Sequence, residues 1–373
     1  MKSVLKVLGT VVGGASLSML VACGGSGSGS GSSTMQTFAE TLLVSDGAVP
    51  AAHTDPNLKN AWGVAFNPKG FAWVADNATN VATLYDGNGV PQPLVVSIPD
   101  GMNGPTNPTG IVFNGTADFM ISQGGKSGVA AFIFAGEGGT ITAWAPAVQP
   151  TAALIEHDDG PGGAVYKGLA LASNNGNNFL YATDFHNNKI DVFDRTFTKV
   201  TMPGNFHDPS LPAGFAPFGI QAIGSRLFVT YAQQDAAAHD DVAGAGLGFV
   251  DVFDTAGNFQ QRFVSGGPLN APWGITQAPS NFGSLSNAVL IGNFGDGKIN
   301  AFDQSSGLFM RTLNTANGSA FVQGGLWGIA FGNGLDNQPT NTLFFAAGPN
   351  DETNGVYGRI DVQSVMTSSM PMM

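Results

Sequence analysis

This chain of 373 residues contains a single cysteine, and charged residues make up only 11% of it. One cysteine cannot form an intramolecular disulfide, so burial and hydrogen bonding must hold the fold together. Acidic residues outnumber basic ones by 26 to 14, which argues against a nucleic-acid partner because nucleic-acid-binding proteins present a basic patch. No window keeps a 3.6-residue apolar period over three turns, and long helices are therefore not expected.

Glycine is abundant, with 53 residues, and the chain contains 27 phenylalanines. One pattern occurs six times: an apolar or proline-led approach, a glycine and a short apolar run. The six repeat glycines are Gly63, Gly110, Gly168, Gly219, Gly274 and Gly328. They are 47 to 58 residues apart, a spacing typical of β-propeller blades. The sequence therefore predicts an all-β fold, a six-bladed β-propeller with four-stranded antiparallel blades.

The fifth copy illustrates one blade. Its strand-like runs are 274–277, 288–292, 298–302 and 308–313, with turn-rich stretches between them. The sixth copy has little strand pattern after Val362, whereas residues 37–44, before the first copy, read as a strand without a partner. We expect this N-terminal strand to complete the last blade, because closure removes exposed sheet edges.

The N-terminal residues indicate export. Lys2 and Lys6 precede an apolar stretch that is too short for a span of about 20 apolar residues. It ends in Leu20-Val-Ala-Cys23, which resembles a bacterial lipobox, and this resemblance implies that Cys23 is lipidated. The alternative is an ordinary secretory signal with an incidental cysteine.

Four segments follow from these patterns. We expect a lipoprotein signal peptide at 1–22, a lipidated cysteine with a flexible Gly/Ser linker at 23–34, the propeller at 35–362 and a C-terminal tail at 363–373. Gly24 stands where an inner-membrane retention signal would have Asp, so the outer membrane of the cell envelope is favoured. The membrane is then a partner only through the lipid, and we expect a monomer.

The propeller meander also predicts where a site lies. The segment before each inner strand and the turn between the second and third strands of each blade meet at one mouth of the central channel. The polar candidates for ligand binding in these segments are His53, Asp55, Asn77, Glu137, Asp184, His186, Tyr231, Gln233, Asn293, Asp296, Asn350, Asp351 and Glu352. Asp and Asn at strand ends also bond their own turns, which is the alternative interpretation.

A subset of these residues suggests a hard cation such as Ca²⁺, which takes oxygen ligands. The metal candidates are Asp184, His186, Asn293, Asp296, Asn350 and Asp351. The five histidines lack the spacing of a zinc site, and the chain has neither a Gly-x-Ser-x-Gly elbow nor a phosphate-binding loop. Catalytic residues are not identified.

The motifs Tyr166-Lys-Gly-Leu-Ala-Leu171, Asp184-Phe-His-Asn187, Ala271-Pro-Trp-Gly274 and Asn350-Asp-Glu352, together with Asn60-Ala-Trp-Gly63, resemble an uncharacterised family of exported bacterial proteins with NHL-like propellers. Some members of that family carry an exosortase sorting tail, whereas residues 368–373 here read Ser-Ser-Met-Pro-Met-Met. A looser likeness is to gluconolactonase-type six-bladed enzymes, which hold one divalent metal in the channel through Glu, Asn and Asp. No matching set with that spacing is found here.

Three functions remain open. The first is an extracytoplasmic binding module that takes a small molecule, a glycan or an envelope protein at one channel mouth. The second is a metal-dependent hydrolase, for example of lactones, in which the ion activates water. The third is a structural envelope protein. The sequence favours a protein that is not an enzyme, and it predicts no nucleic-acid partner.

Overall fold

The computed structural model describes residues 34–366, with side chains described for 36–363. Residues 35–365 form one compact unit. The predicted signal peptide, Cys23 and nearly all of the linker lie outside the described residues, as does the end of the tail. The first tail residues continue the last strand, β28 (Val356–Met366).

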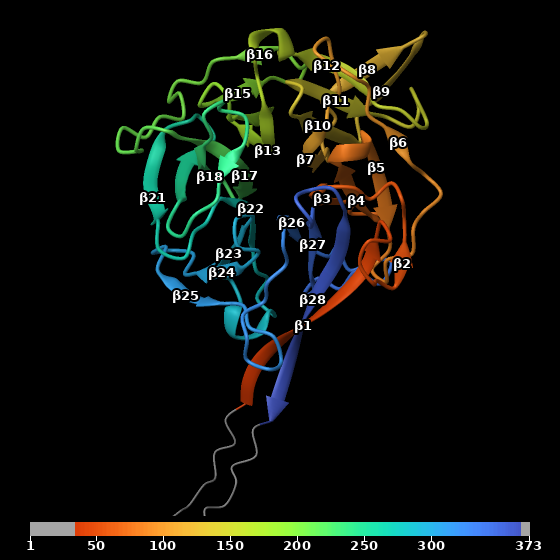
Figure 1. Cartoon of the computed structure of the whole chain (residues 1–373). Helices are drawn as coiled ribbons and strands as arrows, with labels where there is room; N and C mark the ends of the chain where they lie inside the picture. Colours follow the sequence, from red (N-terminus) through yellow and green to blue (C-terminus); the bar gives the residue numbers. More distant parts are fainter. Residues whose placement is uncertain (1–33, 367–373) are drawn as a thin grey trace, which may run out of the picture. The chain divides into compact units, whose positions relative to one another are not determined.

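Six antiparallel sheets are arranged in a ring around a central axis (Figure 1). Blade one contains β3 (Ala61–Phe66), β4 (Ala72–Asp76), β5 (Val81–Tyr85) and β6 (Val96–Ser97). Blade two contains β7 (Pro108–Phe113), β10 (Phe132–Gly136), β11 (Thr140–Trp144) and β12 (Leu154–Asp158). Blade three contains β13 (Tyr166–Asn174), β14 (Asn177–Asp184), β15 (Lys189–Phe193) and β16 (Lys199–Val200).

Blade four contains β17 (Phe215–Ile223), β18 (Arg226–Gln234), β20 (Phe249–Asp254) and β21 (Phe259–Ser265). Blade five contains β22 (Pro272–Gln277), β23 (Val289–Asn293), β24 (Ile299–Phe302) and β25 (Phe309–Thr312). Blade six contains β26 (Leu326–Phe331), β27 (Leu343–Ala347), β28, β1 (Thr34–Ser45) and β2 (His53–Thr54). The predicted six-bladed β-propeller is confirmed.

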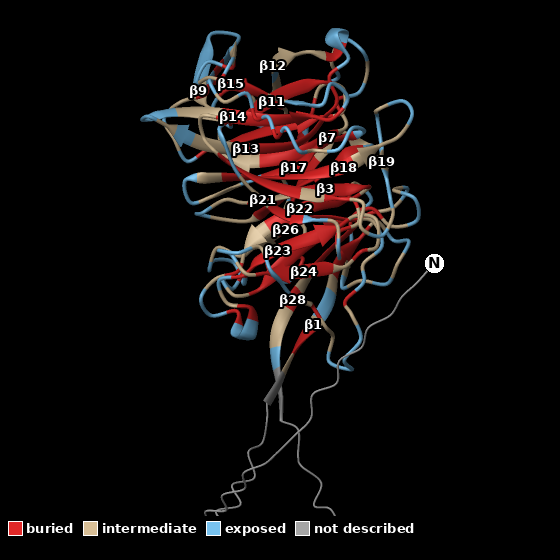
Figure 2. Ribbon diagram, turned by 90° about the vertical axis from the view of Figure 1, so that its left-hand side faces the viewer, coloured by how far each residue is buried: buried red, intermediate tan, exposed pale blue. Residues whose placement is uncertain are grey.

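The second strand of several blades is buried along its whole length. β4, β10, β23 and β27 have every residue buried, because each lies between two neighbouring blades. A strand covered on both faces reads as a continuous apolar run instead of an alternating one. Figure 2 shows this burial through the strands, with exposed residues gathered in hairpins and connections.

The repeat glycines allow adjacent inner strands to approach each other closely. A Cβ added at any of the six would lie less than 3.0 Å from a backbone atom of the next blade in the ring. Gly63 faces Thr109 O of blade two, and Gly328 faces Trp62 O of blade one, so the contact pattern closes on itself. The sequence repeat therefore follows from the close contact between blades.

The N-terminal strand closes the ring, as predicted. β1 lies beside β28 at the outer side of blade six, and the short β2 pairs with β1 in parallel. Leu43 and Val44 of β1 pack in a core cluster with Tyr357 of blade six and Tyr85 of blade one. The strand runs from Thr34 to Ser45, longer than the predicted 37–44.

Two of the blades carry insertions that form small additional strands. In blade two, residues 114–130 contain a hairpin of β8 (Met120–Gln123) and β9 (Lys126–Val129). In blade four, residues 233–246 contain β19 (Asp241–Val242), which pairs with the end of β18. Three short 3-10 helices complete the described elements: η1 (Asn77–Thr79), η2 (Gly160–Gly162) and η3 (Gly283–Leu285).

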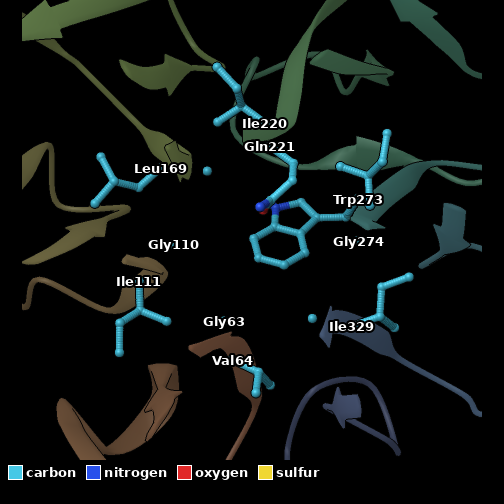
Figure 3. A pocket seen from close by; sticks show the side chains of 13 residues that line it. Gly63, Val64, Gly110, Ile111, Leu169, Ile220, Gln221, Trp273, Gly274 and Ile329 are labelled. Carbon is cyan, nitrogen blue, oxygen red and sulfur yellow. The ribbon is translucent and has the colours of Figure 1, made fainter. Parts of the chain in front are cut away.

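The channel along the axis is nearly filled. Its interior leaves about 50 Å³, lined by repeat glycines and branched aliphatic side chains. Figure 3 shows Trp273 and Gln221 projecting into the centre of this ring, with Ile111, Leu169 and Ile329 around them. The interior has room for little more than water, so a larger ligand must bind at a mouth.

Within residues 34–366, no helix has the length and apolar character needed to cross a membrane.

Candidate functional site

The end of the channel at which the inner strands begin carries a connected group of polar side chains, which we call the polar mouth. Its residues are Asn60, Asn77, Glu137, Lys167, His239, Asp240, Asp241 and Glu352. Except for Lys167, which lies near the start of β13, they lie before an inner strand or between the second and third strands of a blade. The meander of five different blades therefore brings them together.

Lys167 is the central cation of the polar mouth. Its side chain is only 2% exposed, and its ammonium forms ion pairs with Glu137 and, at 3.2 Å, with Asp240 Oδ1. Burial alone would lower the pKa of Lys167, but the two carboxylates raise it above its ordinary value. Lys167 is therefore a charged structural cation and not a free amine nucleophile.

Hydrogen bonds extend from this ion pair around the ring. Glu137 Oε2 accepts a bond of 2.9 Å from Asn77 Nδ2. Asn77 Oδ1 accepts one of 3.2 Å from Asn60 Nδ2, which also donates to Glu352 Oε2 at 2.7 Å. The arc thus joins blades six, one, two and three, and Asp240 extends it to blade four.

Three tryptophans form the floor beneath this arc. Trp62 stacks on Trp327 with 3.5 Å between ring centroids, and Trp273 meets both edge-on. Trp327 Nε1 donates to Asn60 Oδ1 at 3.1 Å, and Trp273 Nε1 donates to the carbonyl of Lys167 at 2.9 Å. Because the ammonium also lies 5.3 Å from the Trp62 ring centroid, the floor holds the polar residues in place.

Carboxyl groups outnumber cationic side chains at the polar mouth. Burial raises the pKa of Asp241 to about 7, opposed by the Lys167 charge and aided by the Glu352 carboxylate. Asp241 Oδ2 is buried without a hydrogen-bond partner. Burial also raises the pKa of Glu352. The hydrogen bond between His239 and Asp240 raises the pKa of the imidazole and lowers that of the carboxyl. Four carboxyl groups thus surround one lysine.

A pocket of about 450 Å³ opens beside Glu137, the ion-pair partner of Lys167. Its walls come from blades two, three and four, and its lining residues are Asn103, Pro105, Asn107, Glu137, Gly138, Gly160, Gly163, Ala164, Val165, His186, Ala237 and His239. Its polar groups comprise one carboxylate, two imidazoles and two amides. This composition provides hydrogen-bond acceptors and donors but no exposed cation.

One wall of the pocket is the blade-four loop, residues 235–240, which connects β18 and β19. His186 Nδ1 lies 3.2 Å from the carbonyl of Ala238, and Gln234 Nε2 donates to the carbonyl of Phe185 at 2.6 Å. Together with the Lys167–Asp240 ion pair, these contacts fasten the loop to blade three.

Four of the residues predicted from the sequence meet here. Asn77, Glu137 and Glu352 belong to the hydrogen-bonded arc, and His186 lines the pocket together with Glu137.

Other predicted residues bond mainly within their own turns. Asp184 accepts from Val165 N and from both nitrogens of Asn187. Asn293 Nδ2 donates to Asp296, which also pairs with Lys298. Asn350 Nδ2 donates to Asn354 Oδ1, and Asp351 is exposed. These contacts match the alternative interpretation, in which such residues stabilise turns.

The remaining predicted residues lie elsewhere in the blades. His53 is in β2, at the outer edge of blade six, and buried Asp55 accepts a 3.0 Å bond from Tyr85 Oη. Tyr231 is buried in β18, where Tyr231 pairs with Phe249 and Gln233 with Val242.

Sequence reasoning missed Asn60, Lys167, His239, Asp240 and Asp241. A signal was present for Lys167, because it precedes a repeat glycine at a position where the other copies have Trp, Thr or Phe. The other four gave no such signal, because their roles depend on contacts between blades.

Within residues 34–366, one group of three His, Cys, Asp or Glu side chains has ligand atoms within 4.8 Å of one another, and it consists of Glu137, His239 and Asp240. The histidine and acidic members of the predicted metal set are not in it. Two of its carboxylates already pair with the Lys167 ammonium.

The opposite mouth has a different character. A depression of about 440 Å³ is lined mainly by apolar residues such as Phe66, Phe113, Leu171 and Phe331. Its polar side chains are Gln221, Thr276 and Gln277, so no charged group lines it. The ionisable groups of the channel therefore gather at the polar mouth.

Two uncharacterized proteins of Acanthamoeba polyphaga mimivirus resemble the chain over most of its length. One is 32% identical over 331 residues, covering 87% of this chain and 80% of the relative. The other is 33% identical over 335 residues, covering 87% and 86%. The chain belongs to their family. Because these relatives are viral and uncharacterized, they do not test the bacterial, exported origin expected from the sequence. No family model matches the chain.

Solved structures resemble the chain in fold. A protein of unknown function from Bacteroides thetaiotaomicron is 11% identical, with a TM-score of 0.55, covering 89% of this chain and 77% of that protein. A virginiamycin B lyase from Staphylococcus aureus is 14% identical, with a TM-score of 0.48, covering 88% and 99%. At these identities, no activity is transferred to the chain.

Proposed function

We propose that this protein is a binding module that takes a small polar molecule in the pocket of the polar mouth. The observation that carries the proposal is the pocket of about 450 Å³ whose carboxylate, Glu137, is fixed by a buried lysine. Ligand sites are typically concave, largely preformed and supplied with a few placed polar groups, and this pocket has all three properties.

The rigidity of the site supports binding. One carboxylate oxygen of Glu137 pairs with Lys167, and the other accepts a hydrogen bond from Asn77. Because the side chain is already ordered, ligand binding would lose little conformational entropy there. Trp62, Trp273 and Trp327 close the channel below, which limits the depth of a ligand.

The lining favours a ligand that carries hydroxyl or amino groups. The Glu137 carboxylate accepts hydrogen bonds, and the imidazoles of His186 and His239 can donate or accept. No lysine or arginine lines the pocket, so an anionic ligand would meet the Glu137 carboxylate without an exposed cation to balance its own charge. A sugar unit or a small amino alcohol matches these groups better than a carboxylic acid.

The test is a binding screen of the wild-type protein against neutral mono- and disaccharides, amino alcohols and small carboxylic acids. Saturation-transfer NMR finds binders, and calorimetry measures their Kd. We expect binders among the first two classes, with a Kd at least ~10-fold weaker in His239→Ala, because a lost hydrogen bond in the pocket costs about 1.5 kcal/mol.

His207→Ala is the matched control, since His207 is an exposed histidine away from this pocket and should leave the Kd unchanged. The proposal fails if no compound binds, or if the affected and control variants bind equally well.

We further propose that the module is tethered to a membrane through lipid on Cys23, with the Gly/Ser segment as its flexible leash. The support is the lipobox-like Leu20-Val-Ala-Cys23 followed by residues 24–33. The envelope location expected from the sequence is part of this proposal.

A further inference from the structure

Lys167 bears on whether a divalent metal can bind at the polar mouth. The likeness to gluconolactonase-type propellers implies one metal held in the channel, and the polar mouth has the carboxylates and amides for it. We propose instead that the Lys167 ammonium is the resident cation of this mouth and takes the place of a divalent metal.

The position of the ammonium is the first support. It lies between Glu137 of blade two and Asp240 of blade four, the two carboxylates that belong to the three-ligand group with His239. A calcium ion bound to the same two oxygens at about 2.4 Å would be almost in contact with the ammonium nitrogen. Two cations cannot share that position.

The charge state of Lys167 is the second support. A metal could displace its proton if the amine were easily neutralised, but the pKa of Lys167 is raised by its carboxylate partners. Nor can the side chain withdraw into water, because it is 2% exposed and lies over Trp62. The ammonium is thus fixed in both charge and position.

The remaining contacts of the ring are the third support. Glu137 Oε2 and Glu352 Oε2 each accept a hydrogen bond from an asparagine, so the amide nitrogens of Asn77 and Asn60 point toward the carboxylates. An asparagine that binds a metal presents its oxygen, but Asn60 Oδ1 accepts from Trp327 and Asn77 Oδ1 accepts from Asn60. The donor set fits an ammonium and does not fit a divalent ion.

Terbium provides the test, because Tb³⁺ binds calcium-type oxygen sites and emits when a nearby tryptophan such as Trp62 is excited. Wild-type protein, stripped with chelator, is titrated beside Lys167→Ala and Lys167→Met. We expect sensitised emission to saturate at a Tb³⁺ concentration at least ~100-fold lower in Lys167→Ala than in wild type. The double variant Lys167→Ala/Asp240→Asn should lose this gain.

Lys189→Ala is the matched control, because Lys189 also pairs with two aspartates but lies away from the polar mouth. It should behave like wild type. Lys167→Met preserves the length of the side chain and replaces Lys167→Ala if the shorter variant does not fold.

If neither variant folds, calcium titration of the wild type decides by calorimetry. No uptake below millimolar Ca²⁺ supports the proposal. Wild-type uptake at micromolar Ca²⁺ that Asp240→Asn abolishes overturns it, as does a Lys167→Ala variant with wild-type terbium affinity. Neither result depends on whether a small polar molecule binds in the pocket.

Discussion

Lys167 shows how one residue can organise a surface made by several blades. Its partners Glu137 and Asp240 are 30 and 73 residues away in the chain, yet both reach the same ammonium. Leaving one partner of such a buried pair uncompensated typically costs about 3–5 kcal/mol. The pair therefore constrains the relative positions of blades two, three and four at the polar mouth.

Glu156, in β12 of blade two, gives a prediction on pH dependence. Burial raises its pKa from 4.5 to about 7, so the folded state holds a proton that the unfolded state releases between these values. Stability is therefore lost as pH rises through this window. Glu156→Gln should be more stable than wild type at pH 8 by about 1 kcal/mol, a value reduced for solvent screening, and equally stable at pH 4.

Urea unfolding at the two pH values measures this difference. Asp303→Asn is the opposite control, because hydrogen bonds from Ser305 and Ser306 lower the pKa of Asp303. That carboxylate stabilises the fold when ionised, so its variant should be less stable at pH 8. Equal stability of Glu156→Gln and wild type at pH 8 would contradict the burial argument.

At this scale the sequence predicted only part of the site. Asn77, Glu137 and Glu352 could be found because strand-end turns converge in any propeller meander. Lys167 could not be paired with Glu137 in advance, because the pair depends on the side-chain directions of two blades. Asp184, Asp296 and Asn350 also lie in turns at strand ends, but they bond within their own turns. Only the contacts in the structure distinguish them from the residues of the polar mouth.

Among the elements, the inner strands carry the strictest sequence requirement. Gly274 in β22 lies against Trp327 O and Ile329 of blade six, with no room for a side chain. Gly274→Ala should therefore destabilise the protein by about 1–3 kcal/mol, because overpacking forces the two strands apart. The midpoint of urea unfolding at neutral pH measures this loss.

Gly162→Ala is the matched control, since a Cβ at Gly162 meets no atom within 4 Å and its backbone does not require glycine. A loss of similar size in both variants would show that the close contact between blades is not the cause.

Elements differed in how well they could be predicted. The second and third strands, such as β23 and β24, were predicted to within a residue or so because burial on both faces gives continuous apolar runs. Outer strands are short and half-exposed, and β6 and β16 have two residues each. Their pattern is too brief to separate from a turn, and β2 was not predicted at all.

For the whole molecule, the proposed lipid tether predicts that the protein is located at a membrane. When the full chain is expressed in a bacterium with a lipoprotein pathway, wild type should partition into the detergent phase of a Triton X-114 extract. Cys23→Ser should move to the aqueous phase, because no other cysteine can take the lipid. Mass spectrometry of the N-terminal peptide identifies the acyl group.

Ala22→Gly keeps a small residue before the cysteine and should leave the partition unchanged. A wild-type protein found wholly in the aqueous phase, with an unmodified Cys23, would contradict the tether.

The number of blades and the closing strand were predicted correctly because both follow from counting: six glycine-centred copies, one strand missing at the end and one spare strand at the beginning. The polar mouth did not follow from any count, since it depends on contacts among five blades.

The pairing of β1 with β28 also affects how the protein is made. Of the described strands, β1 is synthesised first, and its partner β28 is synthesised last. Until β28 is present, β1 cannot pair with it and the ring of blades stays open. A truncated translation product would therefore expose two unpaired sheet edges. An interrupted molecule would therefore differ from a finished one in leaving both of those edges unpaired.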